Sequence, residues 1–136
     1  MIVLEKHKKL KRKIYETTLN GEIVHAITMP ECFHIEVFFA CIHLKNDCFA
    51  ISCYDKLYLI KCNGDFIKQF VSNTTAIDDP WGLVTDNNLN LFIADFGNEK
   101  IHVFDFDLDF VKSFDSQCVT SYLYFDSIRN RLLVIS

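Results

Sequence analysis

The stretch that decides the fold runs from residue 79 to residue 114, DPWGLVTDNNLNLFIADFGNEKIHVFDFDLDFVKSF. Four apolar runs in it are separated by Asn, Asp and Gly, the residue types that favour turns. The runs cover residues 83–86, 91–94, 101–106 and 110–114. They predict four short strands that pair as one antiparallel sheet.

The same stretch resembles the NHL repeat, the blade of a β-propeller family. The family pattern has Pro-x-Gly and an Asp around the first strand, Ala-Asp at the end of the second, Asn in the turn, and Ile-x-x-Phe in the third. The matching residues are Pro80, Gly82, Asp86, Ala94, Asp95, Asn98, Ile101 and Phe104. The resemblance implies an all-β fold built from four-stranded blades.

The residues between the second and third strands have the composition of a tight turn. Asp95 can accept backbone N–H groups, and Gly97 and Asn98 tolerate left-handed backbone angles. Turn chemistry therefore explains these three residues better than a ligand-binding role for Asp95, which is the alternative.

The Pro-Trp-Gly run at the start of the stretch suggests three different roles. Pro80 lacks an N–H donor, which predicts a place before the first strand, and Gly82 allows this strand to pack closely near a propeller axis. Trp81 is interpreted as a core residue because large aromatics dominate buried area. The alternative for Trp81 is an exposed recognition residue.

An internal repeat extends the blade pattern to the whole chain. Asn20-Gly21 between two apolar runs is a strong hairpin signal, and the unit recurs at Asn63-Gly64, 43 residues later. Residues 109–114 repeat residues 65–70 after another 44. Such a period indicates stacked blades. We therefore predict one propeller segment over residues 1–136, with blades at about 1–28 (partial), 37–71, 79–114 and 119–136 (partial).

About three blades do not close a propeller. A blade buries its faces only against its neighbours, so the end sheets need cover. Six blades of about 44 residues need roughly 264 residues, close to two copies of this chain. We expect further blades, or a second copy of the chain, to complete the ring.

Composition limits the classes of protein that fit this chain. Half of the 136 residues are hydrophobic, with 13 Phe but only 4 Gly and 2 Pro, which favours strands over disorder. No apolar run reaches the ~18 residues of a membrane span. The start, MIVL, leads directly into basic residues, unlike a secretory signal. We predict a cytoplasmic protein with no membrane partner.

The six cysteines do not suggest a metal or disulfide framework. None forms a C-x-x-C pair, and most lie among strand residues, as expected of reduced thiols that pack as small hydrophobes. Cys41 and His43 offer two ligands on one strand face, and Cys32 and His34 do the same upstream. The recognised zinc spacings are absent, so no metal and no cofactor is predicted.

Positive charge is concentrated near the start of the chain. Residues 6–13 read KHKKLKRK and hold six of the 14 Lys and Arg residues, whereas all 18 acidic residues lie elsewhere. A solvated tail or sheet edge is the simplest interpretation. The alternative is a nucleic-acid-binding or import segment. The candidate binding residues are Lys6, Lys8, Lys9, Lys11, Arg12 and Lys13, together with Trp81 and Lys100.

The NHL resemblance implies a face that binds proteins or RNA. This face would collect the loops between blades and the loops between second and third strands. We therefore predict a non-catalytic scaffold that binds protein partners, with an RNA-binding module as the alternative. NHL propellers often accompany ubiquitin-ligase modules, but the chain has no RING or B-box spacing.

A third interpretation is a fragment of a metal-dependent propeller hydrolase or lyase, because related propellers catalyse such reactions. The residues of suitable type are Asp86, Asp95, His102 and His43. None forms a recognisable nucleophile–base pair or metal spacing. His102 alternates with Ile101 and Val103, which predicts that it faces solvent or a cross-strand neighbour. The chain is therefore predicted not to be an enzyme.

Overall fold

The computed structural model describes residues 2–5, 13–29, 38–45, 47–53, 56–70, 76–118 and 120–136, with backbone alone for 2–5, 38 and 39. This part of the chain contains strands and turns but no helix, and therefore no helix that could cross a membrane. Its strands form four antiparallel sheets. The all-β prediction is confirmed.

The two central sheets each have four strands in chain order. Sheet B consists of β4 (Phe38–Leu44), β5 (Cys48–Cys53), β6 (Lys56–Lys61) and β7 (Phe66–Gln69). Sheet C consists of β8 (Pro80–Thr85), β9 (Leu91–Asp95), β10 (Lys100–Phe104) and β11 (Phe110–Asp115). The bounds of sheet C lie within a few residues of the runs predicted from the alternation of apolar and turn residues.

The two outer sheets have fewer described strands. Sheet A consists of β1 (Ile2–Glu5), β2 (Lys13–Thr17) and β3 (Ile23–Thr28). The β2–β3 hairpin turns at Asn20-Gly21. Gly21 has a φ of 86°, the left-handed conformation that tight hairpin loops require at one position or more. Sheet D consists of β12 (Tyr122–Asp126) and β13 (Arg131–Ile135).

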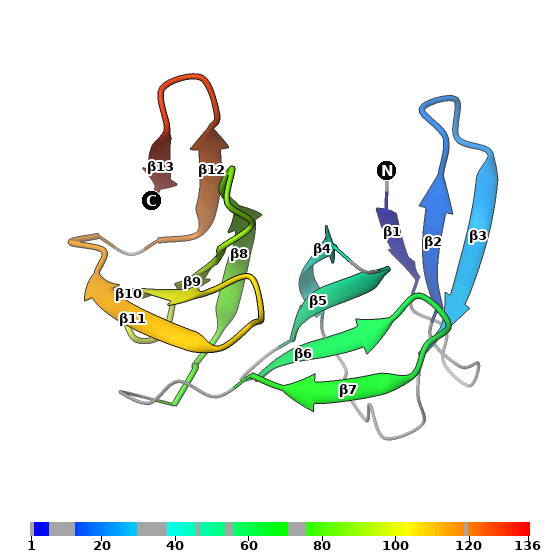
Figure 1. The fold of residues 1–136 in the computed structure, drawn as a ribbon, viewed down its shortest axis with the longest axis horizontal. Helices are drawn as coiled ribbons and strands as arrows, with labels where there is room; N and C mark the ends of the chain where they lie inside the picture. The colour runs from blue at the N-terminus through cyan, green and yellow to red at the C-terminus, as the bar shows by residue number, and fades with distance from the viewer. Residues whose placement is uncertain are drawn as a thin grey trace.

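The four sheets follow one another along an open arc, from sheet A through B and C to D (Figure 1). The first strands of sheets B, C and D lie innermost, and β8 contacts both β4 and β12. A Cβ atom on Gly82 of β8 would lie 3.0 Å from the backbone N of Leu123 in β12. The prediction that Gly82 allows its strand to pack closely is therefore confirmed, whereas its place near a propeller axis stays a prediction.

Two apolar cores hold neighbouring sheets together. The core between sheets A and B contains Ile14, Ile27, Met29, Phe49, Ile51 and Ile60. The core between sheets B and C contains Leu44, Ala50, Leu57, Leu59, Phe70, Ile77, Leu91, Ile93 and Phe104. Phe104 lies at the centre of this second core, with its ring edge-on to Phe70 at a centroid distance of 5.0 Å. A sheet is thus buried on both faces only when another sheet packs against each of them.

Sheet D has one described neighbour and a large exposed apolar surface. Tyr122, Tyr124, Leu133 and Ile135 are all exposed. The sheets form no closed ring among the described residues. The expectation that further blades or a second copy complete the propeller stays a prediction.

Two local predictions about sheet C were wrong. Pro80 is the first residue of β8, not a residue before it, because this position has no need of the missing N–H donor. In the β9–β10 turn, the left-handed residue is Glu99, with a φ of 52°, and not Gly97 or Asn98. Gly97 instead provides space, because a Cβ there would lie 2.4 Å from Oδ2 of Asp78.

Candidate functional site

Two loops of sheet C form a continuous surface at one end of the strands. The segment before β8 and the β9–β10 turn (residues 96–99) are joined by backbone hydrogen bonds from Gly97 N to Asp78 O (2.9 Å) and from Phe96 N to Asp79 O (3.1 Å). The amide of Asn98 also donates to Ala76 O at 2.7 Å. We call this surface, residues 76–81 and 96–100, the connector face.

An aromatic pair lies on the connector face. The rings of Trp81 and Phe96 stack with a centroid distance of 4.7 Å and an interplanar angle of 14°. Both residues are half-buried, so part of each side chain remains in contact with solvent. Trp81 is therefore neither a fully buried core residue nor a fully exposed one.

The charged residues around the aromatic pair are mainly acidic. Asp78 and Glu99 are exposed, and the carboxylate of Asp78 lies against Gly97, next to Phe96. Lys100 is held by Asp115 in an ion pair of 2.7 Å, with 28% of the lysine side chain exposed. This candidate binding residue is therefore already neutralised locally.

Most of the basic segment, residues 6–13, lies outside the residues that the structure describes. Lys6, Lys8, Lys9, Lys11 and Arg12 are outside the described residues. Lys13 is the first residue of β2 and is exposed. The structure places it in a different sheet from Trp81 and Lys100, so these three candidates do not form one cluster.

A histidine–carboxylate pair is buried beneath the connector face. Nε2 of His102 in β10 lies 2.6 Å from Oδ2 of Asp95 at the end of β9, and both side chains are fully buried. Asp95 also accepts hydrogen bonds from Asp78 N, Asn98 N and Asn98 Nδ2. The prediction of a turn role for Asp95 is confirmed. Of the two alternatives predicted for His102, exposure to solvent was wrong and contact with a cross-strand neighbour is confirmed, because Asp95 lies on β9, which pairs with β10.

The other residues considered for catalysis are separated from this pair. Asp86 organises the β8–β9 turn, where its carboxylate accepts hydrogen bonds from Asn88 N, Asn90 N and Asn90 Nδ2. His43 is exposed near the end of β4 in sheet B. The structure therefore does not bring Asp86, Asp95, His102 and His43 into one site.

A small cavity of about 200 Å³ lies between sheets B and C at the opposite end of the strands. It is lined by His43, Leu44, Lys45, Cys48 and Leu59 of sheet B and by Thr85, Leu89 and Phe106–Leu108 of sheet C. We call this end, which contains the β4–β5, β6–β7, β8–β9 and β10–β11 turns, the hairpin face.

The described cysteines are thiols. No disulfide joins Cys41, Cys48, Cys53, Cys62 and Cys118, the five that the structure describes. Burial raises the pKa of Cys41 to about 12, and it also raises the pKa of Cys48 and Cys62. Cys41 packs against the core between sheets A and B, as predicted for a small hydrophobe.

Sequence reasoning did not identify Phe96 as a candidate site residue. Its place directly after the Ala-Asp end of a strand was a usable signal, because this turn was expected on the same face as the loop before Trp81. The stacking itself depends on how the two loops hydrogen-bond, which no spacing along the chain reveals.

Residues 78–104 match the family model of the NHL repeat. This stretch is similar to an NHL repeat. It contains β8, β9, β10 and both residues of the stacked aromatic pair, so the resemblance on Pro80, Gly82, Asp95 and Asn98 is confirmed. Comparison with curated proteins finds no match.

Several solved structures share the fold at low sequence identity. A protein of unknown function from Bacteroides caccae is 12% identical, with a TM-score of 0.71 over 85% of this chain and 45% of that one. Virginiamycin B lyase from Staphylococcus aureus is 14% identical, with a TM-score of 0.65 over 96% of this chain and 47% of the lyase. A gluconolactonase from Xanthomonas campestris is 13% identical, with a TM-score of 0.62 over 97% and 44%.

These similarities establish the β-propeller fold. The chain spans less than half the length of each of these three structures. At such low identity, what each relative binds or converts is a property of that relative.

Proposed function

We propose that the chain is a non-catalytic interaction module, and that the connector face of sheet C binds a protein partner. The observation that carries this proposal is the stacked, half-buried pair of Trp81 and Phe96. Trp is enriched among the residues that dominate binding energy at protein interfaces. An aromatic pair that is partly exposed supports a role as an anchor point for a partner side chain.

The hydrogen bonds that hold the two loops of the connector face together also favour binding. The backbone hydrogen bonds from Gly97 to Asp78 and from Phe96 to Asp79 fix the two loops against each other. The buried carboxylate of Asp95 ties the same two loops together through Asp78 N and Asn98 N. A surface fixed before binding loses less conformational entropy when a partner docks.

The charges indicate the chemistry of the partner. Asp78 and Glu99 are exposed in the two loops of the connector face, whereas Lys100 is paired with Asp115. An acidic rim around aromatic rings suits a Lys or Arg side chain, through ion pairing and cation–π attraction. We therefore propose a protein segment that presents a basic residue next to an apolar one.

Selection from a phage-displayed library of random peptides tests this proposal. Peptides selected on the full chain should be enriched in Arg or Lys next to an apolar residue, and should lose binding to the Trp81→Ala variant. Phe66→Ala, a change at an exposed aromatic in β7, is the matched control and should keep binding. Peptides that bind the parent and Trp81→Ala equally would overturn the proposal.

The alternative of an RNA-binding module depends on Lys6–Lys13. The exposed position of Lys13 at the start of β2 favours it, but the acidic connector face does not. This alternative predicts that affinity for a single-stranded RNA homopolymer falls steeply with salt, and that changing Lys8, Lys9, Lys11 and Arg12 to Ala makes the slope shallower. Absence of salt-dependent RNA binding would exclude it.

The enzyme alternative is supported by the fold shared with a lyase and a gluconolactonase. Asp95 and His102 do not support it, because both side chains are fully buried and make no contact with solvent. We propose that this pair has a structural role. We further propose that the protein is cytoplasmic. We also propose that further blades or a second copy of the chain close the ring.

A further inference from the structure

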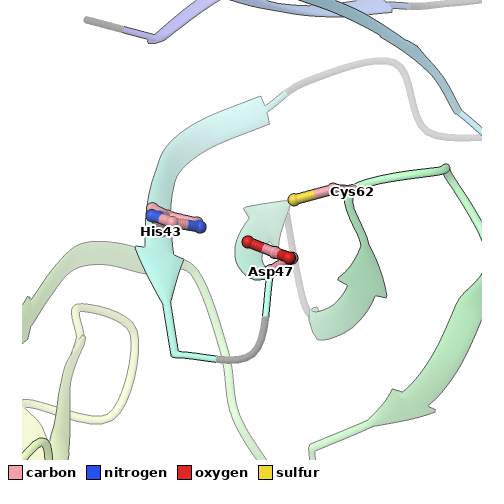
Figure 2. A group of neighbouring side chains, drawn as sticks. All are labelled: His43, Asp47 and Cys62. Atoms are coloured by element: carbon pink, nitrogen blue, oxygen red, sulfur yellow. The ribbon is translucent and has the colours of Figure 1, made fainter.

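Three side chains of metal-binding type converge on the hairpin face of sheet B. His43 lies near the end of β4, Asp47 in the β4–β5 turn and Cys62 directly after β6. One ligand atom from each residue lies within 4.8 Å of the other two. Figure 2 shows that the three side chains come from separate segments and point into the same space.

The backbone fixes the two turns that contribute these residues. The N–H of Cys62 donates to the carbonyl of Asp47 at 2.7 Å, which joins the start of the β6–β7 turn to the β4–β5 turn. His43 pairs with Phe49 across the β4–β5 hairpin, and the two rings are in contact at a centroid distance of 5.0 Å. The cluster therefore has a defined geometry although its members are partly exposed.

The ligand atoms are not used elsewhere in the described part of the chain. The His43 ring nitrogens, the Asp47 carboxylate and the Cys62 thiol make no hydrogen bond or ion pair there. Other aspartates at turns do make such bonds, as Asp86 does with Asn88 and Asn90. The left-handed backbone of Asp47 favours Asp at this turn position, but its carboxylate makes none of the hydrogen bonds that Asp86 makes.

Sheet C shows that the blade itself does not require these residue types. The strand pairing places Thr85 opposite Leu91, as His43 lies opposite Phe49. The same pairing makes Leu89 the equivalent of Asp47 and Phe106 the equivalent of Cys62. Asp47 and Leu89 even share a left-handed backbone, with φ of 53° and 64°. The same turns are thus built in sheet C without His, Asp or Cys at these three positions.

We infer that His43, Asp47 and Cys62 form a binding site for a zinc ion, with a water molecule as the fourth ligand. Imidazole, carboxylate and thiolate are the zinc ligands found in proteins, at about 2.0–2.3 Å from the metal. Two ligands of a tetrahedral ion are then about 3.5 Å apart, so small side-chain rotations close the cluster around the metal. The thiolate favours zinc over magnesium or calcium, which prefer oxygen ligands.

The site is separate from the connector face, so the inference does not depend on the proposed function.

Cobalt substitution tests the site directly. The full chain, without an affinity tag and treated with a chelator, is titrated with Co²⁺, which gives an absorption band from sulfur-to-metal charge transfer when a thiolate binds it. We expect the band to saturate at one Co²⁺ per chain, to disappear on addition of Zn²⁺, and to be lost in Cys62→Ala. His43→Gln and Asp47→Asn, at exposed positions, should each weaken Zn²⁺ binding by about tenfold or more.

Cys48→Ala is the matched control, because Cys48 lies next to the cluster in sequence but is not one of its ligands. This variant should keep the charge-transfer band and an affinity close to that of the parent. The inference is overturned if the parent gives no band, if Cys62→Ala keeps it, or if His43→Gln and Asp47→Asn bind zinc as tightly as the parent. Circular dichroism confirms that each variant retains its strands before it is scored.

Discussion

Nε2 of His102 lies 2.6 Å from Oδ2 of Asp95, and both side chains are completely buried within sheet C. The other ring nitrogen of His102, Nδ1, has no hydrogen-bond partner among the described residues. The Asp95 carboxylate also accepts hydrogen bonds from three donors in the two connector loops, Asp78 N, Asn98 N and Asn98 Nδ2. Its contact with His102 links β9 to β10. This pair fixes the connector face from below.

We predict that His102→Ala strongly destabilises the chain. Removal of the imidazole leaves the Asp95 carboxylate buried without its β10 partner, which costs about 3–5 kcal/mol in the free energy of unfolding. Urea denaturation followed by circular dichroism measures this loss. His25→Ala, at an exposed histidine in β3, is the control and should change stability by no more than about 0.5 kcal/mol. Equal effects of the two changes would contradict a structural role for the buried pair.

The burial of His102 shows why the alternation of residue types along β10 does not predict which residues face solvent. In a sheet with one solvated face, the residue between two apolar neighbours faces water. β10 is a strand of a sheet covered on both sides, so Ile101, His102 and Val103 are all buried. Alternation correctly located the strand but could not assign its two faces, because the neighbouring sheets decide them.

The fold was largely predictable because its signals are local. The turn at Asn20-Gly21 and the repeat period placed the hairpins, and the four strands of sheet C lie within a few residues of the predicted runs. The stacking of Trp81 on Phe96 and the cluster of His43, Asp47 and Cys62 were not predictable. Each depends on hydrogen bonds between two turns that are separate in sequence, and those bonds are set by the register of the sheet.

A second prediction concerns the contact between sheets C and D. In Gly82→Ala, the added Cβ would lie 3.0 Å from Leu123 N and 3.2 Å from Ser121 O and the Tyr122 Cα. These are backbone atoms of β12 and the residue before it, so the strands must move apart. We expect a loss of about 1–3 kcal/mol in unfolding free energy.

Thermal and urea denaturation check this expectation, with Lys112→Ala in the outer strand β11 as an exposed control. The control should stay within about 0.5 kcal/mol of the parent. A Gly82→Ala protein as stable as the parent would show that β8 and β12 do not pack closely in solution.

A third prediction is a decrease in stability at alkaline pH that depends on Cys41. Burial raises the pKa of this thiol from its ordinary value of 9.0 to about 12 in the folded chain. The folded state therefore keeps its proton at pH values where the unfolded chain loses it. This stabilisation is fully present below about pH 9 and is lost as pH rises toward 12.

The measurement is the free energy of unfolding as a function of pH for the parent and Cys41→Ala. The parent should lose up to about 1.4 kcal/mol per pH unit more than the variant in the window above pH 9. Cys118→Ala, which removes a half-buried thiol at another position, is the control and should follow the parent. Parallel curves for the parent and Cys41→Ala would contradict burial of this thiol.

The last prediction concerns the aromatic pair on the connector face. Trp81→Ala removes one ring of a stack held at 4.7 Å, together with the larger apolar surface that a partner would contact. For peptides selected on the parent, we expect the change to cost about 2 kcal/mol, or roughly 30-fold in affinity. Asp78→Asn and Glu99→Gln should weaken binding less and should make it less sensitive to salt, because they remove charge from the rim.

Isothermal titration calorimetry with one selected peptide measures these affinities. The Trp81→Phe variant distinguishes a requirement for any aromatic ring at this position from a requirement for the larger indole. Because Phe preserves a stacked aromatic, this variant should recover most of the lost affinity. If Trp81→Ala binds like the parent while the Asp78 and Glu99 variants do not bind, the acidic rim rather than the aromatic pair is the recognition element. If all four variants bind like the parent, the partner docks on a different part of the propeller.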